Sequence, residues 1–185
     1  IALFLFFITA LCIRVNLNGM PLSHPGNIKA ADPFYHTIIT DIILDTHQWK
    51  YYPEYVSYDI DKAIDQQPPL LYTDSAELSS LSGVPSWATI FFLVALAAAL
   101  RIILLYLLTL EIFNNKDIAL LAAATYVIPF NTGAWLYEMY IGFWIQVLGF
   151  TFILCFTWLF IKYLKERKEW ILYGLGFSAA GVMLA

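Results

Sequence analysis

The stretch from residue 84 to 113 is apolar almost throughout, and it limits most strongly what this chain can fold into. A helix needs about 20 consecutive apolar residues to cross the hydrocarbon core of a bilayer. This stretch is longer, so it predicts a transmembrane helix that is tilted or extends into the interface. Its apolar residues would cover every face of a helix instead of one stripe, which disfavours a water-soluble helical bundle.

The whole chain follows the same pattern. Hydrophobic residues make up 61% of its 185 positions, compared with about 45–50% in soluble domains. From the apolar segments we expect a truncated transmembrane helix 1 at 1–13, a first extracytoplasmic loop at 14–83, helix 2 at 84–113, helix 3 at 117–137, helix 4 at 140–163 and a truncated helix 5 at 169–185. The predicted fold class is therefore all-α, a polytopic transmembrane helical bundle with a large outer loop.

Three further expectations follow from the sequence as a whole. The chain begins without Met and ends inside an apolar segment, so we expect a fragment of a longer protein. Its net charge of −4 disfavours nucleic acid as a partner. Cys12 and Cys155 both lie in apolar segments, where they are interpreted as packing residues and not as a disulfide or metal site.

Charge predicts the orientation of the helices. The connection at 162–168 holds Lys162, Lys165, Arg167 and Lys168. Cytoplasmic loops carry an excess of lysine and arginine, so we expect this connection to be cytoplasmic. Alternation then places 114–117 on the same side, and 14–83 and about 131–140 outside. The protein would be a multi-pass protein of the cell membrane, or of the endoplasmic reticulum membrane in a eukaryote.

An amphipathic helix is predicted within the outer loop, from about Pro33 to Asp45. Phe34, Ile38 and Ile42 recur at helical spacing. Asp32 followed by Pro33 resembles a helix start, with an acid at the N-cap and proline at the first helical position. We expect this interfacial helix to lie along the membrane surface, with its apolar face against lipid or the other spans.

Asp32 has two interpretations. It caps the helix, or it acts at the membrane surface as a catalytic base or metal ligand, because carboxylates bind hard cations such as Mg²⁺ and Mn²⁺ together with phosphate. His36 lies one turn later on the same face, as a surface histidine or as part of a site. Arg101 lies within the predicted second span, and it either serves function or extends its side chain to the interface.

Several short motifs together carry a resemblance. Asp32-Pro33-Phe34-Tyr35-His36 opens the amphipathic helix, Tyr52-Pro53 follows, and Gln67-Pro68-Pro69-Leu70 leads into the second span. In this layout the chain resembles the glycosyltransferase C superfamily, polytopic enzymes that use sugars linked to polyprenyl phosphate. It is most similar to the oligosaccharyltransferase catalytic subunit and its archaeal relatives. The protein mannosyltransferase branch fits less well, since its Asp-Glu pair is replaced by Asp32-Pro33.

The resemblance implies a set of site residues. An acid in the first outer loop is catalytic in that superfamily, which by position is Asp32, and a second acid in the next outer loop corresponds to Glu138. These two would hold a divalent metal ion, Mn²⁺ or Mg²⁺. Tyr35, His36 and Arg101 are expected to bind substrate. The triplet Asp59-Ile60-Asp61 is a weaker metal candidate, because such triplets are common in acidic loops.

The expected function is transfer of a sugar or oligosaccharide from a polyprenyl- or dolichyl-phosphate-linked donor, at the extracytoplasmic face, to a protein, lipid or glycan acceptor. The alternative is a transporter or permease subunit. Transporters have interrupted helices and polar sites near the membrane midplane, whereas the polar residues here concentrate in one outer loop. A structural membrane subunit without a site is a third possibility.

Overall fold

The structure, a computed structural model, describes residues 1–17, 31–48, 69–127 and 144–185, and within these ranges every regular element is an α-helix. The longest is α5 (Ser86–Phe113), which at 28 residues measures about 42 Å. Pro85 precedes it, and Asn114 ends it in a left-handed conformation, with its N–H donated to the carbonyl of Leu110. The expected second span is therefore a single uninterrupted helix.

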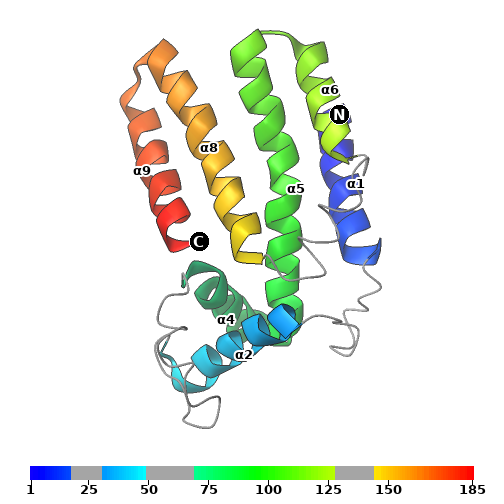
Figure 1. The fold of residues 1–185 in the computed structure, drawn as a ribbon, viewed down its shortest axis with the longest axis vertical. Helices are drawn as coiled ribbons and strands as arrows, with labels where there is room; N and C mark the ends of the chain where they lie inside the picture. The colour runs from blue at the N-terminus through cyan, green and yellow to red at the C-terminus, as the bar shows by residue number, and fades with distance from the viewer. Residues whose placement is uncertain (18–30, 49–68, 128–143) are drawn as a thin grey trace.

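The helices that run along α5 flank it on two sides (Figure 1). On one side lie α1 (Ala2–Leu17) and α6 (Lys116–Val127), and on the other lie α8 (Trp144–Glu166) and α9 (Glu169–Leu184). α5 contacts α1, α6 and α8, while α9 packs on α8. The chain passes up and down through these helices, as alternating spans require.

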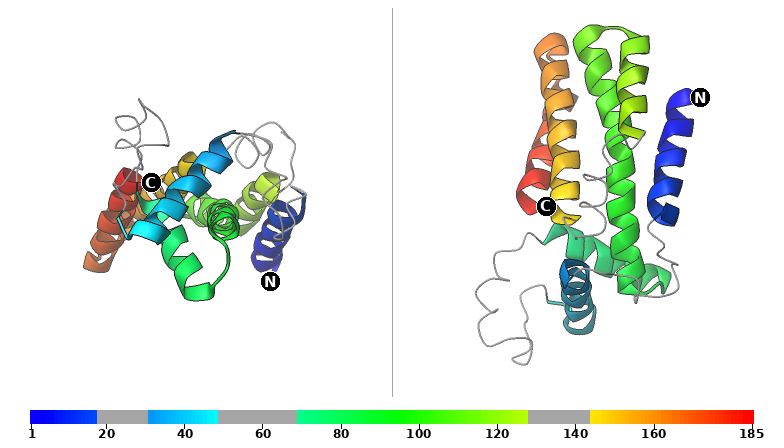
Figure 2. Two further views of the ribbon diagram at one scale, coloured as in Figure 1. Left: turned by 90° about the horizontal axis from the view of Figure 1, so that it is seen from below. Right: turned by 45° about the vertical axis from the view of Figure 1, so that its right-hand side comes forward.

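Two further helices, α2 (Ala31–Thr46) and α4 (Leu70–Ser82), lie across one end of this bundle. Seen from below and from the side, both run across the axis of α5 (Figure 2). They contact each other and both contact α5. The predicted amphipathic helix is therefore present, and it lies crosswise to the bundle as an interfacial helix would.

The sequence did not predict α4, which lies inside the stretch assigned to the outer loop. Its buried residues are mainly small or hydroxylated, and they are Leu71, Tyr72, Ser75, Ala76 and Ser79. Such a stripe gives little hydropathy signal. A second correction concerns α1, which continues to Leu17 although residues 14–17 were assigned to the loop.

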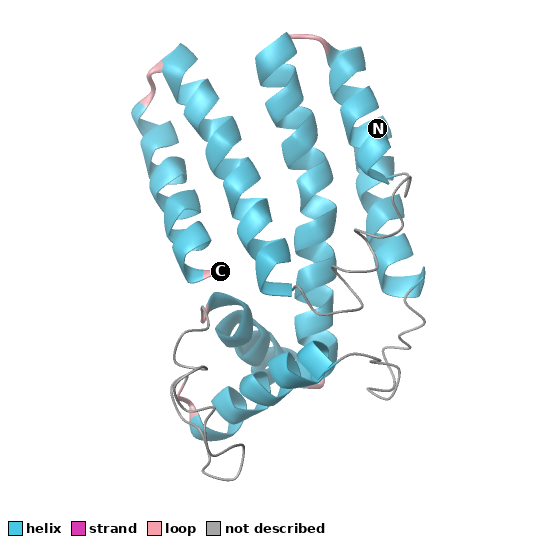
Figure 3. Ribbon diagram, viewed as in Figure 1, coloured by secondary structure: helices cyan, strands magenta, loops and turns pink. Residues whose placement is uncertain are grey.

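The short connections on either side of the bundle lie at its opposite end (Figure 3). These are the turn at 114–115 between α5 and α6, and the turn at 167–168 between α8 and α9. An ion pair of 3.1 Å between Lys165 and Glu111 joins α8 to α5 near this end. The two connections predicted to be cytoplasmic thus share one end, away from α2 and α4.

The main core lies where four helices meet. α2 contributes Ile39 and Ile43, α4 contributes Leu71 and Tyr72, and α5 and α8 supply residues such as Phe91, Val94, Trp144 and Val147. This core therefore fixes α2 and α4 against the bundle.

The fold class predicted from sequence is confirmed. The described residues form an all-α structure in which α5 and α8 are long and apolar enough to cross a membrane. Two shorter apolar helices, Ala2–Cys12 and Glu169–Leu184, accompany them. The second half of the predicted span at 117–137 and the start of the one at 140–163 lie outside the described residues.

Candidate functional site

Asp32 lies in the first turn of α2, which begins one residue earlier at Ala31. Helix boundaries vary by a residue or two between criteria, so the predicted start agrees with the structure. The first turn of a helix carries a partial positive charge from the aligned peptide dipoles, which favours an acidic residue or a bound anion. The backbone at Asp32 is therefore in a place where an acid and a phosphate are both favourable.

His36, one turn later, is buried. Its side chain is only 5% exposed, so the interpretation as a surface histidine is wrong. Its Nδ1 lies 2.8 Å from the hydroxyl of Tyr72 in α4. Its ring stacks on Trp144 in α8, with centroids 5.4 Å apart and planes at 25°. The expected role in substrate binding stays a prediction.

Tyr35 is half-buried beside His36, with the ring centroids 6.1 Å apart in an edge-on arrangement. Burial raises the pKa of the Tyr35 phenol, because desolvation disfavours its ionised form. Its hydroxyl thus remains a neutral donor and acceptor at the end of the bundle where Asp32 lies. A part in substrate binding remains a prediction for this residue as well.

The outward side of α2 is apolar near its start. Phe34 and Ile38 are 44% and 45% exposed, whereas Ile39 and Ile43 on another side belong to the main core. Phe34 and Ile38 are thus only partly covered by the protein, and Ile42 is half-buried. Contact of this stripe with lipid stays a prediction.

Arg101 lies near the middle of α5 and is 4% exposed, so the interpretation in which it extends to the interface is wrong. Its Nε donates to the hydroxyl of Thr151 at 3.2 Å and its Nη2 to the backbone carbonyl of Val147 at 2.6 Å, both in α8. Its Nη1 donates to the hydroxyl of Tyr126 in α6 at 3.1 Å. The guanidinium group therefore connects three helices.

An apolar cavity of about 360 Å³ lies beside this connection, between α5 and α8. Apolar side chains of both helices line it, including Leu96, Leu100 and Phe152, and Asp74 of α4 lies at its edge. Burial raises the pKa of the Asp74 carboxyl, and the charge of Glu77 raises it further. Sequence analysis overlooked Asp74, because it was one of many acids in the presumed loop.

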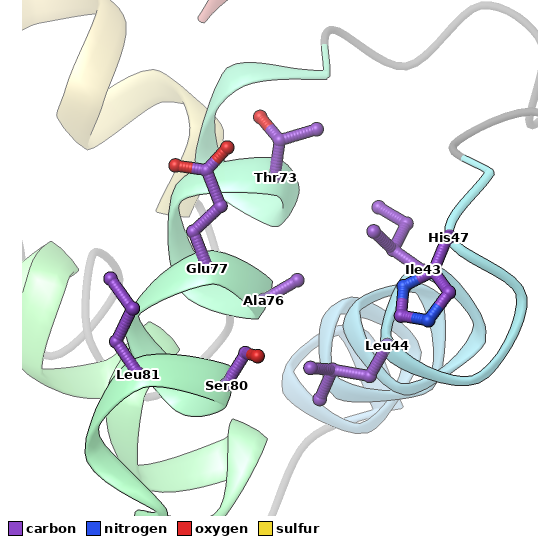
Figure 4. Close-up of a pocket in the computed structure, with 8 residues that line it drawn as sticks. All are labelled: Ile43, Leu44, His47, Thr73, Ala76, Glu77, Ser80 and Leu81. Atoms are coloured by element: carbon purple, nitrogen blue, oxygen red, sulfur yellow. The ribbon is translucent and has the colours of Figure 1, made fainter.

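A second, more open hollow of about 650 Å³ separates α2 from α4. Figure 4 shows His47, which directly follows α2, and Glu77 of α4 on opposite walls, with Thr73 and Ser80 on the same wall as Glu77. Ile43, Leu44 and Ala76 supply apolar surface. A carboxylate and an imidazole thus line this hollow, at positions that the sequence analysis did not single out.

The predicted metal site is only partly within the described structure. Glu138 and the Asp59-Ile60-Asp61 triplet lie outside the described residues, as does the side chain of Asp32. Among the residues that the structure does describe, no group of three His, Cys, Asp or Glu side chains is placed to hold a metal ion. The shared pocket of Asp32 and Glu138 therefore remains a prediction.

Two long apolar helices and a helical layer across one end define an all-helical membrane protein. Comparison with protein families matches residues 66–185 to the family described as dolichyl-phosphate-mannose-protein mannosyltransferase. The chain belongs to this family, whose members are membrane glycosyltransferases that use sugars carried on polyprenyl phosphate. No curated protein matches the chain, and no solved structure does either.

The match bears on the resemblance drawn from sequence. It confirms the glycosyltransferase C superfamily, but it falls on the mannosyltransferase branch, which the Asp-Glu criterion had ranked second. The matched segment begins at residue 66 and so includes Gln67-Pro68-Pro69, which is part of the motif that carried the resemblance. Asp32 and the rest of α2 lie before the matched segment. His36 of α2 contacts this segment at Tyr72 and Trp144.

Proposed function

We propose that this protein transfers a single sugar from a dolichyl- or polyprenyl-phosphate donor to a hydroxyl group of an acceptor at the extracytoplasmic face. The observation that carries the proposal is the family match over 66–185. Mannose is the proposed sugar and a protein the proposed acceptor, since the family description names both. Transfer of a whole oligosaccharide, expected from the nearer resemblance in sequence, is the second candidate.

Asp32 is the proposed catalytic base. It would accept the proton of the acceptor hydroxyl while that oxygen forms a bond to the anomeric carbon of the sugar and the bond from that carbon to the phosphate oxygen breaks. The products are the glycosylated acceptor and the free lipid phosphate. The location of Asp32 supports this role, because α2 lies at the end of the bundle where a lipid phosphate would reside if that end is the outer interface.

The helix layout also supports an enzyme over a transporter or permease. α5 crosses from Ser86 to Phe113 without interruption, whereas substrate sites of transporters are built on broken helices. Arg101, the charge near the middle of α5, is occupied by hydrogen bonds to α6 and α8. It is therefore proposed to hold helices together and not to bind a translocated substrate.

A divalent cation held by Asp32 and Glu138 is a separate part of the proposal. A Mn²⁺ or Mg²⁺ ion would supply positive charge to the leaving phosphate. Among the described residues, no group of three His, Cys, Asp or Glu side chains is placed to hold this ion. If the ion is required, a chelator abolishes transfer and added Mn²⁺ restores it, whereas transfer that survives exhaustive chelation rejects the ion alone.

The catalytic assignment is tested with Asp32→Asn in the full-length protein. Asparagine keeps the capability to cap a helix but cannot take up the proton. We expect transfer of mannose from dolichyl phosphate mannose to fall about 100-fold or more, with the protein still folded. The matched control is Asp41→Asn, which removes an exposed acid further along α2. Near-normal transfer by Asp32→Asn would reject the assignment.

The two donor classes are separated by testing each donor in its own reaction. Purified protein is offered dolichyl phosphate mannose in one reaction and a lipid-linked oligosaccharide in another, with the same peptide acceptor. We expect product with the first donor only. Product with the second donor only would favour the oligosaccharyltransferase-like alternative, and transport of the donor without product would favour the permease alternative.

A further inference from the structure

Three aromatic side chains from three helices meet one turn after Asp32. His36 of α2, Tyr72 of α4 and Trp144 of α8 are 5%, 0% and 0% exposed. The imidazole Nδ1 is 2.8 Å from the Tyr72 hydroxyl, and the two rings lie 5.6 Å apart between centroids. Trp144 stacks on the imidazole and also meets Phe91 of α5 edge-on at 6.3 Å. The cluster therefore ties α2 to three other helices.

The geometry of this cluster fixes α2 in more than one direction. The hydrogen bond fixes the distance from α2 to α4 and the rotation that brings Nδ1 toward the hydroxyl. The stack on Trp144 fixes the height of the imidazole ring relative to α8. Apolar contacts such as Ile39 and Ile43 tolerate sliding better than a directional hydrogen bond does. A buried histidine here thus provides precision that packing alone does not.

The position of the cluster relative to Asp32 makes this precision relevant to the site. Residues four apart occupy the same side of a helix and differ by about 6 Å along its axis. α2 is continuous from Ala31, so the placement of His36 determines the placement of the turn that contains Asp32. Thr40, a turn further from Asp32, is also buried, but its hydroxyl bonds to the carbonyl of His36 within α2.

The cluster also crosses the limit of the family match. Tyr72 and Trp144 lie in the matched segment, whereas His36 and Asp32 precede it. An acid that precedes the segment can serve a reaction in that segment only if something places it there. The observed contacts between His36 and two residues of the matched segment supply that placement.

We propose that His36 is a positioning residue, which through Tyr72 and Trp144 holds the first turn of α2, and Asp32 with it, in place for the transfer reaction. This inference rests on the proposed role of Asp32. In this role the buried His36 acts through Tyr72 and Trp144, in place of the substrate contact expected from sequence. Loss of the hydrogen bond would let the first turn of α2 shift while the main core holds the rest of the helix.

The test uses conservative substitutions in the full-length protein. Tyr72→Phe removes only the hydroxyl, and His36→Phe keeps a ring to stack on Trp144. Since misplacement of a catalytic group by about 1 Å can cost about 100-fold in rate, we expect kcat to fall by tenfold to 100-fold, on the order of that limit. The KM for the lipid-linked donor should change little, because the donor site keeps its residues.

The matched control is Thr40→Val, which removes a buried hydroxyl of the same helix that donates to the carbonyl of His36 within α2. It should leave kcat unchanged. His36→Asn, which can still offer a hydrogen-bonding group to Tyr72, should recover part of the activity lost in His36→Phe. The double variant His36→Phe/Tyr72→Phe should be no slower than either single variant, because both remove one shared bond.

A readout that is independent of activity accompanies the kinetics. Hydrogen exchange of the peptide covering residues 31–36 should be faster in Tyr72→Phe than in Thr40→Val, with exchange in α5 unchanged. Equal exchange and equal kcat in these two variants would overturn the positioning role. Losses that multiply in the double variant would overturn it too, since the residues would then act separately.

The outcome for Asp32→Asn separates the two levels of the argument. If Asp32→Asn abolishes transfer but Tyr72→Phe and His36→Phe do not slow it, the positioning inference fails and the proposed function stands. If Asp32→Asn transfers sugar normally, the proposed base is wrong, and with it the reason for positioning. Slow transfer in all three variants, with Thr40→Val normal, supports both.

Discussion

The Nη2 atom of Arg101 in α5 donates a hydrogen bond of 2.6 Å to the backbone carbonyl of Val147 in α8. This carbonyl also accepts the hydroxyl of Thr151, one turn further on, at 2.8 Å. Thr151 in turn bonds the carbonyl of Ala97 at 3.1 Å. A charged group deep in the apolar bundle is thus built into a network between the two helices that can cross the membrane.

Replacing Arg101 tests the strength of this network. Arg101→Met keeps much of the side-chain volume but removes all three donors, and it leaves the carbonyl of Val147 and the hydroxyl of Tyr126 with fewer partners. We expect the free energy of unfolding to fall by about 2–4 kcal/mol, measured as thermal unfolding in detergent.

The control for this change is Arg167→Met in the turn between α8 and α9. Arg167 is exposed and lies over the ring of Tyr163. Its removal should change stability by no more than about 1 kcal/mol. Equal effects of the two substitutions would show that Arg101 contributes no more than a surface arginine.

Gly181 of α9 is predicted to be required for its close approach to α8. A Cβ atom at this position would lie 2.3 Å from a ring carbon of Phe152. Gly181→Ala should therefore lower thermal stability by about 1–3 kcal/mol through overpacking. Gly176→Ala is the matched control in the same helix, because nothing lies within 4 Å of its added methyl group. Identical melting of both variants would contradict the packing of α9 on α8.

The raised pKa of Asp74 predicts a pH dependence of stability. Between the ordinary aspartate pKa of about 3.9 and the higher value in the folded protein, the folded state binds more protons than the unfolded state. Stability must then fall as pH rises through this window. Asp74→Asn is neutral throughout and should flatten the melting temperature against pH. An unchanged slope in Asp74→Asn would show that another group is responsible.

The orientation predicted from charge is tested by cysteine labelling of intact cells or vesicles. Cys12 and Cys155 are first replaced by alanine. A cysteine introduced at Lys165 should then resist an impermeant reagent added from outside, because cytoplasmic connections are basic. A cysteine at Ser80, at the other end of the bundle and exposed, should react. The reverse labelling pattern would show the opposite orientation, with α2 at the cytoplasmic surface.

Much of the fold could be predicted from the sequence because it depends on local composition and spacing. The apolar stretch that became α5 is unfavourable in water on every face, so a membrane helix follows from its residues alone. Asp32-Pro33 and the repeat of Phe34 and Ile38 specified a helix at α2 through capping and periodicity. The basic residues at 162–168 likewise predicted that this connection and the one at 114–117 lie at the same end of the bundle.

What remained undetermined depended on contacts between distant residues. The helix α4 has a buried face of small and hydroxylated residues, which becomes favourable only when α2 and α5 cover it. The burial of His36 requires Tyr72 and Trp144, which are far along the chain. The sequence by itself determined that the apolar segments and α2 are helices and that the chain belongs in a membrane, but it did not reveal α4. Only the tertiary structure decided which polar groups are buried together, because a polar group enters the interior where partners satisfy its hydrogen bonds.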